Sequence, residues 1–479
     1  MQKIVNNFIY QGIFQVTKIL LPLITIPIVS AALGPTGIGI YNYTNSIVQY
    51  FVLIAGLGVG LYGNREIATV RDNKNDLVKK FWEIFGISFF ISSISFITYI
   101  IIVSFSHYRY LFYLQSLILM GSIFDISWFF MGIEDFKKTS LASLFSQIIS
   151  FFAILFFVKD SNDLWIYVLI QSLNIFLSQT VVWLFIKDKI YFMKIGFSDM
   201  IKHALPSLSY FIPRVAIVLY TNLNKTILGI LDSNESVGYY TNTLILNGIL
   251  VTLITTIDLV LLPKFSNLVA KGDFSSIILT IKKSINIQLF FTFPIMFGII
   301  LISPKLVPWF FGEKFLILIK TIPIVSPLVV IIPLGMAIGR QYLVPMNKIK
   351  VYNLAVIMGA IVSIILNLVL IPLIGLYGAI FATIIAESFV AFTRFYSFIK
   401  ETKIKLPMIS FIKYICSSAL MFIIVNTLTK QFSPSFITTL IQIFSGFVIY
   451  MLLTLLLKCN PIYELIGVYI NSKRGRHNQ

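Results

Sequence analysis

Three basic side chains lie inside long apolar stretches of the sequence: Lys18, Arg214 and Lys225. A Lys or Arg at the centre of a membrane helix costs about 2.5–3.5 kcal/mol on insertion scales, so such a charge usually faces a cavity or an ion pair. Fixed cations can bind a phosphate or diphosphate, and an arginine can do so through paired hydrogen bonds. These three residues are therefore the first candidates for an anion-binding site.

Polar residues accompany these cations at steps of three and four, which places them on one helix face. The first stretch carries Gln11, Gln15, Lys18, Pro22 and Thr25, and a later one carries Ser207, Tyr210, Arg214, Thr221 and Lys225. Arg214 and Lys225 are eleven residues apart, so on one helix they differ by about 20° in direction and about 16 Å in height. Lys18 and Arg214 each lie about 15 Å into their helices, near the middle of a bilayer.

Two further stretches carry amides and hydroxyls on one face. They contain Asn42, Asn45 and Gln49 in one case, and Tyr240, Thr243, Asn247, Thr255 and Asp258 in the other. Each of these amides and hydroxyls can donate and accept hydrogen bonds, which suits a path for a sugar. The same spacing also suits hydrogen bonds between helices, and the sequence leaves both interpretations open.

Three carboxylates also fall within apolar stretches: Asp125, Asp258 and Glu387. They could neutralise the basic residues in buried ion pairs, which is the structural alternative to an anion site. Glu387 has Arg394 seven residues later on nearly the same face, so it could form an internal pair or belong to a relay for H⁺ or Na⁺. We keep the three carboxylates as candidates for ion coupling and expect no other cofactor. The two cysteines and three histidines are too scattered for a metal site.

The elements that must position these residues are membrane helices. The chain is 58% hydrophobic and only 12% charged, with a mean hydropathy of +0.91, whereas soluble proteins carry about twice that charge fraction. Apolar runs long enough to cross a bilayer recur from end to end and predict an all-α protein of about fourteen transmembrane helices. They lie near 8–32, 37–61, 82–105, 110–131, 139–158, 164–186, 204–230, 238–262, 284–303, 317–339, 351–371, 376–398, 408–427 and 434–457.

The basic residues report the orientation of these helices rather than a nucleic-acid partner, although the formal net charge is +18. If the N-terminus is inside, 28 of the 37 Lys and Arg residues fall at inward connections and helix ends, and 5 at outward ones. This asymmetry predicts that both termini are cytoplasmic.

An internal repeat at an offset of 199 residues relates the two halves. Gly39-Ile-Tyr-Asn-Tyr-Thr44 corresponds to Gly238-Tyr-Tyr-Thr-Asn-Thr243, so the first predicted helix corresponds to the seventh. Six helices separate the copies, an even number, so the halves should be parallel repeats. We expect an N-lobe at 1–200, a C-lobe at 201–402, and two further helices with a basic cytoplasmic tail at 403–479.

Four segments together give a family resemblance. They are Leu33-Gly-Pro-Thr-Gly-Ile-Gly-Ile-Tyr41, Gly60-Leu-Tyr-Gly-Asn-Arg-Glu-Ile-Ala68, Trp128-Phe-Phe-Met-Gly-Ile-Glu-Asp-Phe-Lys137 and Asn224-Lys-Thr-Ile-Leu-Gly229. The chain, from about residue 5 to 400, resembles the Wzx-type polysaccharide repeat-unit flippases of the multidrug/oligosaccharidyl-lipid/polysaccharide exporter superfamily. Each segment is weak alone, and their combination carries the resemblance.

The resemblance implies two six-helix lobes in a V, a cation-lined central cavity and alternating access in a bacterial cytoplasmic membrane. Its implied cargo is an undecaprenyl-diphosphate-linked oligosaccharide for capsule, O-antigen or another exopolysaccharide. A polysaccharide polymerase and chain-length proteins are candidate partners besides the bilayer. A diphosphate entering low dielectric needs fixed cations, which agrees with Lys18 and Arg214. No Gly-Lys dipeptide occurs, so the chain has no P-loop for ATP.

Three other functions compete with this one. A membrane polymerase would need catalytic side chains outside the cell, and the longest outward connection expected, 304–316, leaves little room for them. A drug-cation antiporter of the same superfamily should place carboxylates at the cavity centre instead of cations. A lipid II or teichoic-acid precursor flippase is nearer still, and the sequence does not separate it from a repeat-unit flippase.

Overall fold

The computed structural model describes residues 2–404 and 408–461, except for the side chains of 2–16, 18, 19, 212, 213, 259, 260 and 263. This part of the chain consists of helices and short connections, without strands. The helices of the first half are α1 (Gln2–Gly56), α2 (Val59–Val70), α3 (Lys74–Val103), α4 (Arg109–Ile123), α5 (Ser127–Gly132), α6 (Phe136–Phe157), α7 (Leu164–Thr180), α8 (Phe197–Ile201) and α9 (Ala204–Leu231). Those of the second half are α10 (Asn234–Ala270), α11 (Phe274–Phe310), α12 (Leu318–Val325), α13 (Leu328–Ile338), α14 (Ile349–Thr402), α15 (Met408–Thr429) and α16 (Phe436–Leu456).

The described helices confirm an all-helical polytopic membrane protein. Eleven are long and apolar enough to cross a membrane, or twelve when the α8–α9 segment is counted as one span. Two of them contain a non-helical break, at Gly34 in α1 and at Ile374–Gly375 in α14. Dividing these two at their breaks gives fourteen segments, at the places expected from the apolar runs. Gly34 and Gly375 have φ of 64° and 52°, a region that favours glycine.

Several helices are polar inside and apolar outside, as expected when the surrounding solvent is hydrocarbon. The buried face of α16 carries Thr438, Thr439, Gln442, Gly446 and Tyr450, whereas Ile437, Leu440, Phe444 and Phe447 are exposed. The helix α3 repeats this arrangement with buried serines and exposed Phe and Ile side chains. In water such helices would be destabilised, because the exposed face is the apolar one.

The described chain forms two compact units. The first contains the residues up to Gly238 together with Asn367–Leu376, and the second contains Tyr239–Leu366 and the described residues from Tyr377 onward. These units follow packing, whereas the lobe boundaries expected at residues 200 and 402 follow the repeat, and those boundaries stay a prediction.

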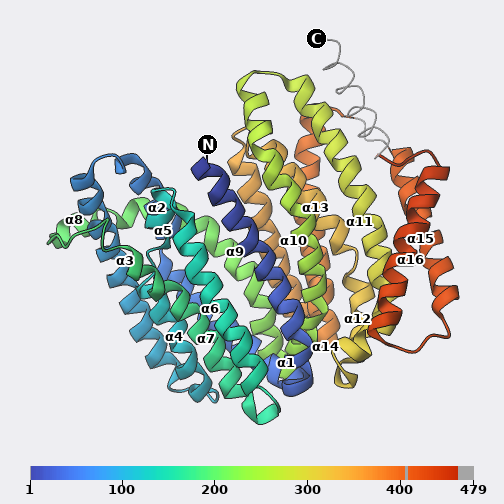
Figure 1. Cartoon of the computed structure of the whole chain (residues 1–479), viewed down its shortest axis with the longest axis horizontal. Helices are drawn as coiled ribbons and strands as arrows, with labels where there is room; N and C mark the ends of the chain where they lie inside the picture. Colours follow the sequence, from blue (N-terminus) through green and yellow to red (C-terminus); the bar gives the residue numbers. More distant parts are fainter. Residues whose placement is uncertain (1, 405–407, 462–479) are drawn as a thin grey trace. The chain divides into compact units, whose positions relative to one another are not determined.

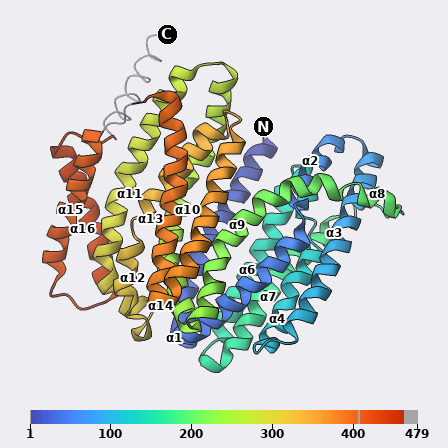
Figure 2. The same ribbon diagram turned by 180° about the vertical axis from the view of Figure 1, so that it is seen from behind.

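In the first unit, α3, α4, α7 and α6 follow one another side by side (Figure 2), and α1 packs on α3, α4, α6 and α9. Its core is aromatic: the Phe81 ring stacks on Trp128 with centroids 5.6 Å apart, and Phe129 meets Phe81 edge-on at 5.2 Å. A Cβ on Gly63 would lie 2.7 Å from Trp128, so a glycine is needed for the indole to pack this closely.

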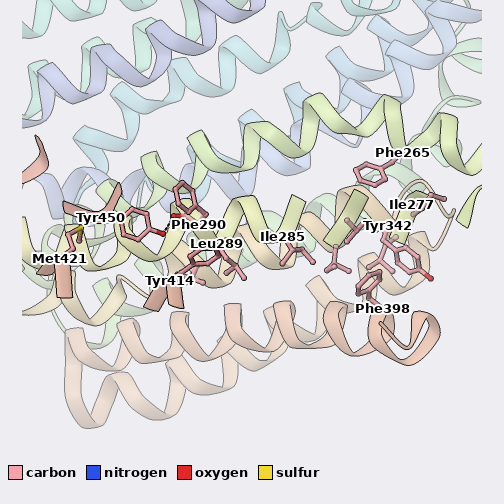
Figure 3. Packing of buried hydrophobic residues seen from close by; sticks show 14 of the residues in the cluster. Phe265, Ile277, Ile285, Leu289, Phe290, Tyr342, Phe398, Tyr414, Met421 and Tyr450 are labelled. Carbon is pink, nitrogen blue, oxygen red and sulfur yellow. Dashed lines mark hydrogen bonds between the residues drawn. The ribbon is translucent and has the colours of Figure 1, made fainter. Parts of the chain in front are cut away.

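In the second unit, α15 and α16 pack side by side against α11 (Figure 1). The core runs along α11, where the Phe290 ring contacts those of Tyr414 and Tyr450 with centroids 5.7 and 5.3 Å apart (Figure 3). The Tyr450 hydroxyl donates to the Phe290 carbonyl at 2.7 Å.

At the start of α11 the Asp273 side chain accepts from the Ser276 N–H at 3.0 Å, and its hydrogen bonds with Ser276 hold the pKa of that carboxyl below its ordinary value.

The two copies of the sequence repeat meet within the first unit. A Cβ on Gly39 would lie 1.6 Å from the Asn234 carbonyl oxygen, and a Cβ on Gly238 would lie 2.0 Å from the Pro35 carbonyl oxygen. Pro35 and Asn234 are themselves separated by the repeat offset, as are Gly39 and Gly238. The contact is therefore reciprocal, as expected for segments related by a twofold axis.

Candidate functional site

Arg214 lies in the continuous helical segment Arg214–Leu231 of α9 and its side chain is exposed. No carboxylate of the first unit lies within ion-pair distance of it among the described residues. Gly60 lies beside it, since a Cβ there would be 3.7 Å from the guanidinium Nη1, an ordinary van der Waals contact. Arg214 is thus a cation in a membrane helix, with no carboxylate partner in the part of its unit that the structure describes.

Lys225 is half-buried on the same helix, three turns after Arg214. No described residue of its unit makes a hydrogen bond or ion pair with it. Since the helix is continuous between them, Arg214 and Lys225 lie on nearly one face and about 16 Å apart along it. The structure therefore brings these two predicted residues together as a line of positive charge.

The polar residues expected on the first, second and seventh helices bond mainly within their own helix. Asn42 Nδ2 donates to the Ile38 carbonyl at 2.9 Å, and Gln49 Nε2 donates to Asn45 Oδ1 at 3.3 Å. Thr25 donates to the Pro22 carbonyl at 3.1 Å and Thr221 to that of Ile217 at 3.0 Å. Each of these side chains retains capacity for a further hydrogen bond.

Hydrogen bonds between α1 and α9 are made by other residues. The Ser46 and Tyr50 hydroxyls each lie 2.8 Å from Thr226 Oγ1. Between α1 and α4, Gln115 Nε2 donates to Thr44 Oγ1 at 3.1 Å. Helix packing is thus satisfied without Asn42, Asn45 and Gln49.

Asn247 belongs to the second unit, where it lies on α10. Only 3% of it is exposed, and neither its Oδ1 nor its Nδ2 has a hydrogen-bond partner in the described part of the chain. Thr243, one turn before it, bonds to Thr321 at 2.7 Å. A buried amide without partners costs free energy unless a ligand or water binds it.

The three carboxylates have different surroundings. Asp125 accepts from the Ser127 N–H at 2.8 Å, a local turn just before α5. Arg394, the residue expected to pair with Glu387, donates to the Gly335 carbonyl at 3.2 Å and lies 4.4 Å from the Tyr352 ring. Asp258 is fully buried and accepts hydrogen bonds from two glutamines.

Gln11, Gln15 and Lys18 were also expected to line the site. They lie in α1, but their side chains are outside the described residues. Their role stays a prediction.

A buried polar chain of the first unit was missed by the sequence reasoning. Glu83 lies 2.9 Å from His203 Nε2, and His203 Nδ1 lies 2.6 Å from the Tyr62 hydroxyl. These three side chains are 1%, 3% and 6% exposed. Lys202 donates to Glu83 at 3.1 Å, and Arg65 donates to the Tyr210 hydroxyl at 2.9 Å.

The available signal was a carboxylate just inside one predicted helix start and a histidine just before another. Nothing in the sequence pairs these two residues, because His203 and Glu83 lie 120 positions apart. The network joins α2 and α3 to the start of α9, the helix that carries Arg214.

Comparison with known proteins decides the family. The polysaccharide biosynthesis protein family matches residues 4–269, more than half of the chain. The chain belongs to this family. A protein of Escherichia coli (strain K12) named as an O-antigen transporter is 24% identical over 407 residues, covering 83% of this chain and 97% of that protein. One of Shigella dysenteriae with the same name is 22% identical, over 58% of this chain and 70% of the relative.

Solved structures show the same fold. The inward closed conformation of the lipid II flippase MurJ has a TM-score of 0.78 at 16% identity, covering 93% of this chain and 98% of MurJ. The inward-facing conformation of a multidrug resistance MATE family transporter of the MOP superfamily has a TM-score of 0.59 at 16% identity, covering 81% and 96%. This member of the polysaccharide biosynthesis family is therefore a multi-pass membrane transporter with a MurJ/MATE-like fold rather than an enzyme.

Proposed function

We propose that this transporter is a flippase that moves undecaprenyl-diphosphate-linked oligosaccharide repeat units from the inner to the outer leaflet of a bacterial cytoplasmic membrane. The products would be capsule, O-antigen or another exopolysaccharide. Support comes from the family, from the names of the two relatives, and from uncompensated cations within a membrane helix.

The observation that carries the proposal is Arg214, exposed in a membrane helix with no carboxylate partner among the described residues of its own unit. A guanidinium in hydrocarbon is costly unless an anion or water meets it. A diphosphate offers oxygens in the geometry that a guanidinium binds with paired hydrogen bonds. Arg214 therefore suits the headgroup, and Lys18 is expected to assist it.

The remaining residues suit the other parts of such a cargo. Lys225 extends the positive charge along α9, so an anion can stay near a cation as it moves along this face. The amides of Asn42, Asn45, Gln49 and Asn247 and the hydroxyls of Thr25, Tyr210 and Thr221 can bond to sugar hydroxyls. The lipid tail can stay in the bilayer. We infer that transport proceeds by alternating access.

Deleting the gene tests the assignment directly. Surface polysaccharide should disappear while undecaprenyl-diphosphate-linked repeat units accumulate on the inner leaflet. Normal surface polymer in a strain without a second copy of this function would refute the flippase assignment. Accumulation of a peptidoglycan or teichoic-acid precursor instead would show that this precursor is the cargo.

Substitution of Arg214 tests the site. Arg214→Glu should abolish export at normal protein abundance, because it replaces attraction for an anion by repulsion, and Arg214→Lys should retain part of it, because the charge remains without the planar fork. Lys271→Glu, at an exposed loop position, is the matched control and should export normally. Rescue of Arg214→Glu by Glu387→Arg or Asp258→Arg would show that the arginine serves an ion pair and would refute its role in cargo binding.

A further inference from the structure

Asp258 lies at the centre of a buried polar cluster that no step of the proposed function uses. Its Oδ1 accepts from Gln288 Nε2 at 2.6 Å and from Gln341 Nε2 at 2.7 Å. Gln341 Nε2 also donates to the Ser284 hydroxyl at 2.8 Å. Asp258 comes from α10, Ser284 and Gln288 come from α11, and Gln341 comes from the π-helical turn Gly339–Leu343, all in the second unit.

Three acceptor oxygens of this cluster have no partner in the described part of the chain. They are Asp258 Oδ2, Gln288 Oε1 and Gln341 Oε1, each on a side chain with 0% exposure. Turning either amide over would not help, because only its NH₂ group can donate to the carboxylate. Since the oxygen and nitrogen of an amide are about 2.3 Å apart, both amide oxygens lie within about 5 Å of Asp258 Oδ1.

The charge of Asp258 is likewise uncompensated at short range. No Lys, Arg or His nitrogen of the described second unit lies within 4.0 Å of its carboxylate. The cation that acts on it from a greater distance is the half-buried Arg340, which donates to the Thr255 carbonyl at 3.3 Å. A buried carboxylate with this little compensation is costly, and so are the neighbouring unpartnered oxygens.

We propose that the Asp258 cluster is a binding site for one dehydrated monovalent cation of the size of Na⁺. One carboxylate and one such cation form a neutral pair, which a buried site tolerates. The unpartnered amide oxygens complete an all-oxygen ligand set, the kind that a hard cation prefers. A divalent ion would usually draw several carboxylates, and the described residues contain no group of three His, Cys, Asp or Glu suited to a metal.

The backbone supports this assignment. Gln341 lies in a π-helical turn, a rare element that often occurs at functional sites because it alters the direction of side chains. The turn begins at Gly339, where a Cβ would lie 2.8 Å from the Tyr352 ring. The glycine lets this turn pack closely while Gln341 bonds to Asp258.

Cation binding can be measured on the purified transporter without cargo. The thermal unfolding midpoint is compared in sodium, potassium and choline chloride at equal ionic strength. A ligand that binds only the folded state raises this midpoint. Sodium should raise it for the wild type, and choline should not. An unchanged midpoint in sodium would overturn the proposal. That result is expected if the carboxyl of Asp258 carries a proton instead of binding a cation.

Variants locate the site. Asp258→Asn should abolish the sodium response. Gln341→Leu should weaken sodium affinity by about tenfold, since the amide oxygen that would bind the cation is lost. Gln442→Leu is the matched control, because Gln442 is another buried glutamine of the same unit with an unpartnered oxygen but bonds to Thr429. A full sodium response in Asp258→Asn would overturn the proposal.

Arg340→Gln keeps the test decisive if Asp258→Asn fails to fold. Removing this positive charge should raise sodium affinity severalfold, and an unchanged or lower affinity would overturn the assignment. A role for this ion in driving transport rests on the proposed function, but the binding of the ion does not. A sodium response that depends on Asp258, together with normal surface polymer in a deletion strain, would refute the flippase and leave the cation site standing.

Discussion

The reciprocal crossing of Gly39 and Gly238 can be tested by adding a single methyl group. Gly39→Ala would place a Cβ 1.6 Å from the Asn234 carbonyl oxygen and 2.5 Å from its carbon, both backbone atoms that no rotamer change can move. Ordinary contacts begin near 3.4 Å, so the two helices would have to separate by well over 1 Å. Because overpacking of this kind costs about 1–3 kcal/mol and occasionally more, we expect a loss of about 3 kcal/mol or failure to assemble.

The assay is the thermal unfolding midpoint and folded yield of the purified protein. Gly238→Ala should behave like Gly39→Ala, since its Cβ would lie 2.0 Å from the Pro35 carbonyl oxygen. The double variant should cost less than the two single costs combined, because one separation of the helices relieves both clashes. Gly248→Ala is the matched control on α10, with nothing within 4 Å of its added Cβ.

Wild-type yield and midpoint for Gly39→Ala would refute this reasoning. So would equal losses for Gly39→Ala and Gly248→Ala, because alanine at an open helical site should be neutral or slightly stabilising.

Three further predictions concern topology, the buried polar chain and the cations of α9. A reporter fused after residue 270 should read cytoplasmic and one after residue 234 external; the reverse result would invert the orientation derived from the basic residues. Glu83→Gln should lower the free energy of unfolding by about 1–3 kcal/mol, because a buried charged hydrogen bond is lost, whereas Arg71→Gln at an exposed pair should leave it nearly unchanged. Lys225→Met should retain or raise the unfolding midpoint, because it removes a half-buried charge that no described residue of its unit pairs with, while export falls; a lower midpoint would show a structural role.

Helix positions could be predicted closely because a span needs a minimum apolar length and is bounded by charge or turn residues. The breaks within spans were harder to predict. The segments 110–131 and 317–339 were each expected as one helix, but the first divides into α4 and α5 and the second into α12 and α13, with a π-helical turn next. The prolines of 317–339 predict a kink, and the break lies at Pro327. In 110–131 the nearly uniform apolar sequence has little periodicity and carries no such signal.

The candidate site was predictable where its signal was local. An isolated charge in an apolar run is visible in the sequence alone, which is how Arg214 and Asp258 were found. Their partners were not, because Gln288 and Gln341 lie 30 and 83 positions from Asp258. Uncharged amides are common in membrane helices, and only packing shows which of them meet a carboxylate.

Two candidate sites of opposite charge lie in different units. In the first unit, no described carboxylate of that unit pairs with Arg214 or Lys225, and an anion is the ligand that lowers the free energy of these cations. In the second unit, the Asp258 cluster presents acceptor oxygens and a carboxylate, and a cation is the ligand that lowers the free energy of these groups. An anionic cargo and a monovalent cation would therefore not compete for one set of ligands. Asp258→Asn and Arg214→Glu should then fail separately, the first in its response to sodium and the second in export.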